Sequence, residues 1–447
     1  MSCAGNPQPS APLTAAWSID QPETVLWRGA GRVTGQRAER ETELVVTWRP
    51  ELDVRFRQEA DDAEDLALFC DEERGEVRLR LRELGIDTSA TPDGTASGGR
   101  LTEVTWGHER RVRRVRFHLT NFPDVLLPGV LGNPNGARWR GTIAVEGGPW
   151  TLRLDRRRET KEIIEHLTAQ GTYAVTHIGE LSRTDRGAFG AGELQEALTC
   201  IHFLFSFARA AWVAPMLPVG FDQDGVPVWW QASARWCTAG LGRGLTWLDR
   251  LDGAGLEEVV HLWLELWQHL LWRQVLPRVV IYYLEANRQG RDDPSFLESK
   301  HAMAQAALEL LAWAILKEDP ITAAGSERWH QGQGAAAKNV RGLLNWAGIP
   351  STVPAELPAL ARELQANKEW QDAADLVPWL RNQVVHPRLR DGCFGPKQEV
   401  VLAGWLLVCW YAELVLLRRL GYTGGISNRL EPDHWVGQTV PVPWADG

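Results

Sequence analysis

Residues 77–82 read Val77-Arg78-Leu79-Arg80-Leu81-Arg82, and this stretch indicates β-structure in the N-terminal part of the chain. Alternation with a period of two places three aliphatic side chains on one face of a strand and three arginines on the other. A half-exposed strand is therefore predicted. Similar runs occur at residues 44–48, 112–119 and 150–154. We expect an N-terminal antiparallel β-sandwich or barrel-like domain over residues 1–157.

The segments around these runs are assigned by their turn residues. Residues 90–99 are rich in Gly, Ser and Thr, which predicts a loop. Residues 219–230 predict a β-hairpin whose turn is Asp222-Gln223-Asp224-Gly225. Helical spacing follows three arginines at 156–158, so residues 158–275 are expected to form a mixed, mostly helical connecting region.

The C-terminal half has helical periodicity almost throughout. Helices are predicted at residues 257–272, 276–287, 296–316, 338–347, 357–369, 376–386 and 398–420. Such lengths predict a helical bundle over residues 276–425, followed by a C-terminal tail, 426–447, that wraps loosely on the surface. The fold class is therefore α+β.

Residues 400–417 are nearly all apolar and about long enough to cross a bilayer. Glu413 lies within them, together with Trp405 and Tyr411. A carboxylate inside an apolar helix favours a buried bundle helix over a membrane span, so no membrane association is expected.

Bulk composition excludes several protein classes. At 447 residues, two or three packed units are expected. A net charge of −9 does not suit a non-specific nucleic-acid coat protein. The six cysteines form no C-x-x-C pair, which argues against a zinc ribbon or a disulfide framework and favours a reducing cytoplasm. Residues 1–7 lack the basic start and apolar run of a signal peptide, so a cytoplasmic location is expected.

One motif remains after common catalytic signatures are excluded. The chain contains no H-E-x-x-H, no G-x-S-x-G and no paired Cys/His ligand set, so neither a metal site nor a cofactor is expected. The remaining candidate is Trp379-Leu380-Arg381-Asn382-Gln383-Val384-Val385-His386-Pro387. Asp375 is a natural N-cap for its helix, which begins there or one turn earlier, with Pro378 tolerated in the first turn.

The motif groups three polar side chains on one helix. Asn382 and His386 are four residues apart, and Arg381 lies beside them. Pro387 places His386 at the helix C-terminus, where the macrodipole favours a protonated imidazole. RNA cleavage by its own 2′-hydroxyl needs a proton-transfer group and a cation, which His386 and Arg381 would supply without metal.

A purely structural explanation of the same residues stays open. Arg381 would pair with a helix carboxylate, Asn382 would cap, and His386 would merely end the helix. The spacing alone does not separate the two, because Arg113 to His118 and Arg429 to His434 have the same spacing in non-helical contexts.

The segment 380–387, preceded by residues 283–287 and 305–311, resembles the HEPN (higher eukaryote and prokaryote nucleotide-binding) superfamily, in which an Arg-polar-x3-His motif closes a helical bundle. The β-rich N-terminal part followed by a HEPN-type bundle is similar to the ApeA-like group of bacterial abortive-infection proteins. The resemblance covers about residues 277–422.

The resemblance implies a metal-independent endoribonuclease with catalytic Arg381, Asn382 and His386, acting on tRNA or other cellular or phage RNA in anti-phage defence. It also implies a homodimer through the bundle and a sensing or regulatory role for residues 1–157. Some members use a further acid, for which Glu285 and Glu309 are candidates. The alternative is a catalytically inactive HEPN module for dimerisation and nucleotide or RNA binding, with recognition by the β-domain.

Arginines 110, 111, 113, 114 and 116 form the densest positive cluster of the chain. A solvated strand face is one explanation of this cluster. A surface that senses RNA or a phage-derived trigger is the other.

Overall fold

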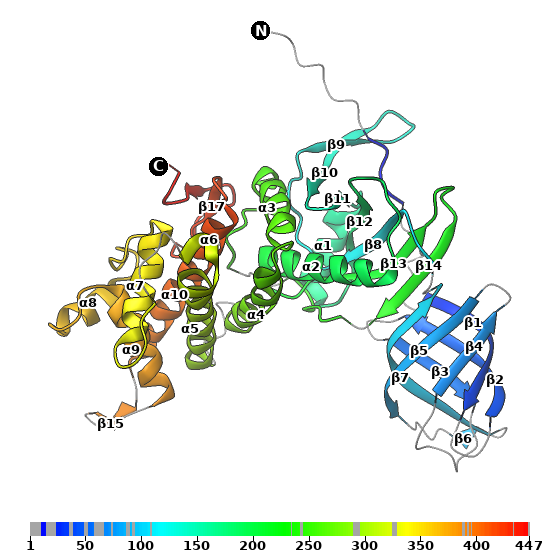
Figure 1. Ribbon diagram of the computed structural model, residues 1–447, viewed down its shortest axis with the longest axis horizontal. Coiled ribbons are helices and arrows are strands. Elements are labelled where there is room, and N and C mark those ends of the chain that lie inside the picture. The colour runs from blue at the N-terminus through cyan, green and yellow to red at the C-terminus, as the bar shows by residue number, and fades with distance from the viewer. Residues whose placement is uncertain are drawn as a thin grey trace, which may run out of the picture. The chain divides into compact units, whose positions relative to one another are not determined.

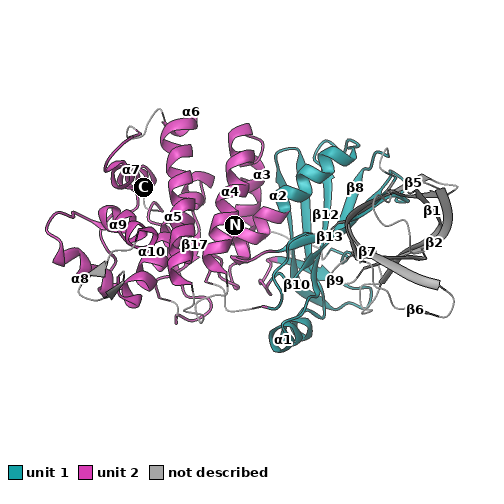
Figure 2. Cartoon of the chain, turned by 90° about the horizontal axis from the view of Figure 1, so that it is seen from below, with its two compact units in different colours: residues 1–122, 129–201, 213–240 teal, residues 123–128, 202–212, 241–447 magenta. Residues whose placement is uncertain are grey.

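The computed structural model describes most of the chain, in two compact units (Figure 2). The described residues are 10–14, 24–34, 39–48, 52–57, 67–72, 75–85, 90–91, 94–107, 110–233, 235–241, 245–288, 296–323, 329–386, 389–390, 393–394, 396–431 and 433–445. Unit 1 comprises residues 1–122, 129–201 and 213–240, and unit 2 comprises residues 123–128, 202–212 and 241–447. A β-rich N-terminal part precedes a mostly helical C-terminal part, which confirms the α+β class.

The first strands of unit 1 form a barrel (Figure 1). They are β1 (Thr24–Thr34), β2 (Glu39–Trp48), β3 (Leu52–Arg57), β4 (Ala67–Glu72), β5 (Gly75–Gly85), β6 (Ala90–Thr91) and β7 (Gly94–Trp106). Antiparallel pairing runs β3-β2-β1-β4-β5-β7, and β7 also pairs with β3. Six strands therefore close on themselves, which removes the unpaired edges of an open sheet. The alternating stretch 77–82 lies in β5, as predicted.

The sheet continues from β7 into a second group of strands. These are β8 (Arg114–Thr120), β9 (Gly129–Gly132), β10 (Arg138–Gly147), β11 (Trp150–Arg156), β12 (Val175–Arg183), β13 (Ala214–Phe221) and β14 (Pro227–Ser233). Residues 103–106 of β7 pair with β14, and the order continues β14-β13-β8-β12-β11-β10-β9. The hairpin predicted at 219–230 is confirmed as β13 and β14, with the Asp222 carboxylate accepting from the Val226 amide at 2.8 Å in its turn.

The loop predicted at residues 90–99 is wrong, because β6 and the start of β7 occupy it. Gly98 pairs with Gly85 of β5 on one side and with Arg55 of β3 on the other. The glycines therefore lie where three strands meet to close the barrel, a position that glycine tolerates and that composition does not distinguish from a loop.

Two helices follow in the first half of the chain, α1 (Thr160–Gln170) and α2 (Ala191–Arg209). The boundary expected at residue 157 falls between β11 and α1, inside unit 1. The boundary expected at 275 falls within a helix of unit 2.

Unit 2 is a helical bundle. Its helices are α3 (Gly253–Leu266), α4 (Leu270–Asn287), α5 (Leu297–Trp313), the π-helical turn η1 (Ala314–Glu318), α6 (Pro320–Ala323), α7 (Ala335–Ala347), α8 (Pro358–Ala366), α9 (Ala373–Val385) and α10 (Gln398–Leu420). The single helix predicted at 257–272 is wrong in one respect, because α3 ends at Leu266 and α4 begins at Leu270. The short strands β15 (Leu389–Arg390) and β16 (Cys393–Phe394) connect α9 to α10.

Helix α10 forms the centre of unit 2. It contacts α3, α4, α5, α7, α8 and α9. Within the described chain it is the one helix long and apolar enough to cross a membrane, and 94% of its apolar window is buried in the protein. The prediction of a buried bundle helix around Glu413 is confirmed.

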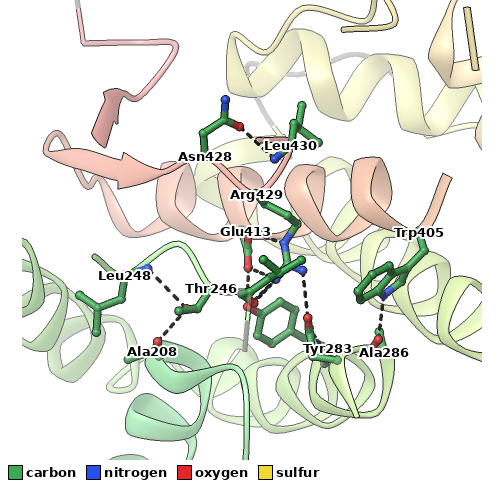
Figure 3. A network of polar contacts seen from close by, with 12 residues as sticks. Ala208, Thr246, Leu248, Tyr283, Ala286, Trp405, Glu413, Asn428, Arg429 and Leu430 are labelled. Atoms are coloured by element: carbon green, nitrogen blue, oxygen red, sulfur yellow. Dashed lines mark hydrogen bonds and ion pairs between the residues drawn. The ribbon is translucent and has the colours of Figure 1, made fainter. Parts of the chain in front are cut away.

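The tail beyond α10 does not wrap loosely, so that prediction is wrong. Its strands β17 (Gly425–Ser427) and β18 (Thr439–Pro441) pair with each other, and Tyr422, Ile426 and Trp444 are buried. Arg429, only 1% exposed, extends from the tail to Glu413 of α10 (Figure 3). A buried charge must find a partner, and this requirement ties the tail to the bundle.

Candidate functional site

Helix α9 carries the candidate motif, and its start is fixed by two carboxylates. Asp372 is the N-cap, with its side chain accepting from the Ala374 amide at 2.9 Å. The prediction of Asp375 as N-cap is therefore wrong. Asp375 lies in the first turn, where it accepts from Arg341 of α7 at 2.8 Å. Arg341 also binds Asp372 at 2.8 Å, so one guanidinium pairs with both carboxylates at the start of the helix.

Pro378 lies inside α9 rather than in its first turn, which corrects the sequence-based placement. A proline there removes the backbone hydrogen bond to the carbonyl four residues earlier. The residue is buried, and so are its neighbours Leu376, Val377 and Leu380. Packing of this apolar face therefore supports the helix where its hydrogen bonding is interrupted.

A close approach of α10 sets the position of the motif. A Cβ added to Gly404 would lie 2.2 Å from Cδ2 of Leu380 and 3.3 Å from Cε1 of His301 on α5. No side chain larger than hydrogen fits at residue 404 without displacement. Since Leu380 immediately precedes Arg381, this contact holds the start of the motif against the bundle core.

The structure brings Arg381, Asn382 and His386 together at the C-terminal end of α9. The Arg381 Nη1 atom donates to Oδ1 of Asn382 at 3.2 Å, and the Asn382 carbonyl accepts from the His386 amide at 2.8 Å. His386 is the C-cap, with φ −124° and ψ 66°. Asn382 and His386 are exposed, and Arg381 is half-buried.

These contacts bear on the structural explanation of the motif. In the part of the chain that the structure describes, no carboxylate forms an ion pair with Arg381. The Asn382 side chain binds Arg381 instead of capping, whereas His386 does end the helix. The guanidinium therefore keeps a charge that no described acid neutralises.

Two tryptophans lie beside the motif. Trp379 precedes Asn382, Gln383 and His386 by three, four and seven residues, so it shares their side of α9. Its ring packs against Trp370 with centroids 4.7 Å apart and planes inclined at 55°. Both residues are half-buried, so an aromatic surface adjoins the motif.

The two candidate acids lie elsewhere. Glu285 pairs with Arg288 at 3.6 Å, and Glu309 accepts from Gln305 at 3.1 Å. Neither is hydrogen-bonded or ion-paired to Arg381, Asn382 or His386 among the described contacts.

Sequence reasoning missed a buried polar network in unit 2 (Figure 3). Arg429 donates to Glu413 at 3.0 Å, to Asn287 at 3.0 Å and to the hydroxyl of Tyr283 at 3.2 Å. The Tyr283 hydroxyl also donates to Glu413. Arg429 and Glu413 are 0% exposed at their side chains, so the network cannot contact a substrate. A lone carboxylate in an apolar helix was the signal that a buried cation had to exist.

The electrostatics of the network are those of a matched ion pair. Burial disfavours the charge of Arg429, but the Glu413 carboxylate outweighs that effect and raises the pKa of the guanidinium. Burial, followed by the charge of Glu413, raises the pKa of Tyr283 well above its ordinary value. Tyr283 therefore acts as a neutral hydrogen-bond donor inside the bundle.

Among the described residues, no group of three or more His, Cys, Asp or Glu side chains is arranged to hold a metal ion. Metal independence nevertheless stays a prediction, since it concerns activity.

Comparison with known proteins relates both units to one protein. Residues 107–241 match the family model of the YopA central domain, and residues 269–441 match that of the YopA C-terminal domain. The chain is similar to YopA. The "SPbeta prophage-derived uncharacterized protein YopA" of Bacillus subtilis (strain 168) is 26% identical over 361 residues, which are 80% of this chain and 78% of that protein. No solved structure matches.

The matched regions follow the architecture described above. The YopA central-domain match covers β8 to β14, and the YopA C-terminal match covers α4 to β18, with α9 inside it. Neither YopA description names the HEPN superfamily, so the likeness of the α9 motif to that superfamily stays a prediction.

Proposed function

We propose that the chain is a metal-independent endoribonuclease in which Arg381, Asn382 and His386 form the active site, with no cofactor. One observation carries the proposal. A guanidinium that no described carboxylate neutralises lies with an exposed amide and an exposed imidazole at one helix end. That set of groups can bind a phosphodiester and move a proton.

The proposed reaction is a transesterification, after which the two RNA fragments are released. The 2′-oxygen forms a bond to the adjacent phosphorus while the bond from phosphorus to the 5′-oxygen breaks. One group removes the 2′-hydroxyl proton and another protonates the leaving 5′-oxygen. The products are a 2′,3′-cyclic phosphate and a 5′-hydroxyl. Arg381 stabilises the charge that develops on the phosphoryl oxygens, and Asn382 orients the guanidinium.

A cytoplasmic role in conflict between phages and bacteria fits this activity. The YopA relative is prophage-derived by its name, which supports a bacterial and phage-related setting. We place the protein as an anti-phage or abortive-infection effector that cleaves cellular or phage RNA, tRNA included. Its β-rich part would sense a phage-derived trigger or restrain the nuclease.

The alternative function is a binding module that uses the same residues without cleavage. The hydrogen bond from Arg381 to Asn382 favours it, because part of the guanidinium is already satisfied within the protein. Binding without turnover distinguishes this alternative from the enzyme.

The decisive assay follows end-labelled total RNA on a gel with purified full-length protein. We expect cutting in the presence of EDTA, and loss of cutting in His386→Ala and in Arg381→Ala with the fold retained. Removal of a general acid–base typically costs 10²–10⁴-fold in rate. The matched control is Arg362→Ala, which removes an arginine 62% exposed on α8 and should cut normally.

Three results would reject the proposal. Undiminished cutting by either motif variant would place the active site elsewhere. Loss of cutting on chelation, restored by Mg²⁺, would show that the chemistry depends on a metal. RNA binding without cleavage by the wild-type protein would favour the binding module.

A further inference from the structure

Unit 1 carries four exposed arginines on two segments that lie side by side. Arg110, Arg111 and Arg113 precede β8, and Arg186 lies in the loop between β12 and α2. The two segments are joined through Val112 and Phe189, whose amides and carbonyls exchange hydrogen bonds of 3.0 and 2.9 Å. We call these four residues the arginine patch.

Two guanidinium groups of the patch are oriented by neutral carbonyl groups. The Arg111 guanidinium donates to the carbonyl of Ala188, and that of Arg113 donates to the carbonyl of Arg186. Arg186 itself has a left-handed φ of 57°, with its amide bonded to the Arg183 carbonyl at 3.0 Å. Carbonyl partners hold a guanidinium in place without cancelling its charge.

The two acids of residues 183–193 are already paired with another arginine. Arg183 binds Asp185 at 3.1 Å and Glu193 at 2.9 Å. The side-chain hydrogen bond from Arg183 lowers the pKa of Asp185, so this carboxylate stays ionised and engaged. Residues 110–113 and 183–193 together carry five arginines and two carboxylates, a net charge of three positive units, in a chain of net charge −9.

We propose that the arginine patch binds the phosphate backbone of RNA. Arginine matches phosphate in a bidentate geometry, and all four cations are arginines. The large apolar residues of these segments, Val112 and Phe189, are 2% and 0% exposed. A surface without exposed apolar anchors suits neither membrane insertion nor the core of a protein interface. The inference rests on the proposed ribonuclease only for the choice of RNA among polyanions.

The test measures binding of a fluorescent 20-nucleotide RNA to full-length protein carrying His386→Ala, so that binding is read without cleavage. The triple variant Arg111→Gln, Arg113→Gln, Arg186→Gln should bind roughly tenfold more weakly. Its slope of log affinity against log salt should be smaller by about 2, since each phosphate neutralised on a single strand contributes about 0.7. The triple lysine variant should keep most of the affinity, which separates lost charge from misfolding.

The matched control is Arg138→Gln, Arg140→Gln, two exposed arginines of β10 in the same unit, which should leave affinity and salt slope unchanged. Equal weakening by control and triple variants would overturn the inference. Unchanged RNA binding in the triple variant would also overturn it. So would a triple variant that loses binding to phosphatidylserine vesicles but keeps its binding to RNA. When His386 is kept, the triple variant should have a higher KM for RNA and an unchanged kcat. If the wild-type protein binds RNA through the arginine patch but does not cleave it, the proposed ribonuclease activity is rejected and the RNA-binding patch is not.

Discussion

Arg429 places a positive charge in the interior of unit 2, where a single carboxylate neutralises it. The Arg429–Glu413 pair is fully buried, and three further oxygens, from Asn287, Tyr283 and Leu245, accept from the guanidinium. A buried pair with its remaining donors satisfied adds little over an apolar pair of the same volume. Removing one partner, however, leaves the other charge without water or a counter-ion.

We therefore expect Arg429→Met to lower the free energy of unfolding by about 3–5 kcal/mol, because Glu413 is left buried and unpaired. The double variant Arg429→Met, Glu413→Leu should recover part of that loss. Urea unfolding measures both, and hydrogen exchange in α10 assigns the loss to unit 2.

The control is the exposed pair Arg362–Glu399, whose side chains are 62% and 56% exposed. Arg362→Met should cost less than about 1 kcal/mol. Equal costs for the buried and exposed arginines would show that burial of the tail arginine does not govern stability.

His301 makes unit 2 sensitive to acid. Burial lowers its pKa to about 4, against 6.5 for the free side chain. The folded state therefore keeps the imidazole neutral, while the unfolded state gains a proton as pH falls below 6.5. Stability is complete above pH 6.5 and is lost as pH falls from 6.5 towards 4, by about 3 kcal/mol for this group.

His301→Leu removes that proton uptake, so its loss of stability between pH 6.5 and 4 should be smaller than that of the wild type. Thermal unfolding at pH 7, 6, 5 and 4.5 gives the comparison. His118 and His177 of unit 1, with pKa values lowered by burial to about 4 and about 3, remain in both proteins. Parallel pH profiles would contradict a role for His301.

At the level of helices, Gly404 decides how closely α10 approaches α9. Gly404→Ala adds a Cβ that would lie 2.2 Å from Cδ2 of the buried Leu380. Such overpacking costs typically 1–3 kcal/mol, although alanine is the better helix former by up to about 1 kcal/mol. We expect net destabilisation, measured by urea unfolding.

The matched control is Gly192→Ala in the first turn of α2, where nothing lies within 4 Å of an added Cβ and φ is not positive. It should be neutral or slightly stabilising. A stabilising Gly404→Ala would show that the α9–α10 contact has room to relax.

Elements with strong periodicity were predictable from the sequence. The period-two stretch in β5 and the apolar run of α10 each satisfy one pattern over many residues, so local signal and tertiary structure agree. The glycine-rich start of β7 was not predictable, since its pairing with both β3 and β5 depends on barrel closure. Composition reports backbone freedom and not strand partners.

In α9 too, some features were predictable from local spacing and others were not. Spacing placed Arg381, Asn382 and His386 on one helix, and the structure brings them together at its end. Asp372 caps the helix and Asp375 does not, and both carboxylates bind Arg341, which lies more than thirty residues earlier. The role of Arg429 was missed for a similar reason. Arg429 lies in the tail and its partner Glu413 lies in α10, so the two side chains come into contact only when the tail folds back onto the bundle. Contacts between distant segments leave no periodic signal.

For the whole molecule, the motif at the end of α9 lacks a second proton-transfer group for the proposed chemistry. One motif supplies a single imidazole, whereas the reaction needs a proton acceptor and a proton donor on opposite sides of one phosphate. A two-fold interface through α9 would supply the second set, because a residue near the axis meets its own copy. Val385, 43% exposed beside His386, gives that side an apolar residue for such a contact.

We therefore predict that the active species is a homodimer whose paired α9 helices share one substrate site. Arg381→Ala and His386→Ala are mixed under conditions that allow subunit exchange. If the two damaged halves combine so that one subunit provides a required arginine and the other a required histidine, the mixture regains part of the activity that both parents lack. Sedimentation of the wild type at assay concentration should show the dimer. Activity that stays absent after verified exchange would show that one intact arginine and one intact histidine from different subunits do not make a working site. A monomer that cleaves RNA at the full rate would reject the dimer, because a single imidazole would then complete both proton transfers.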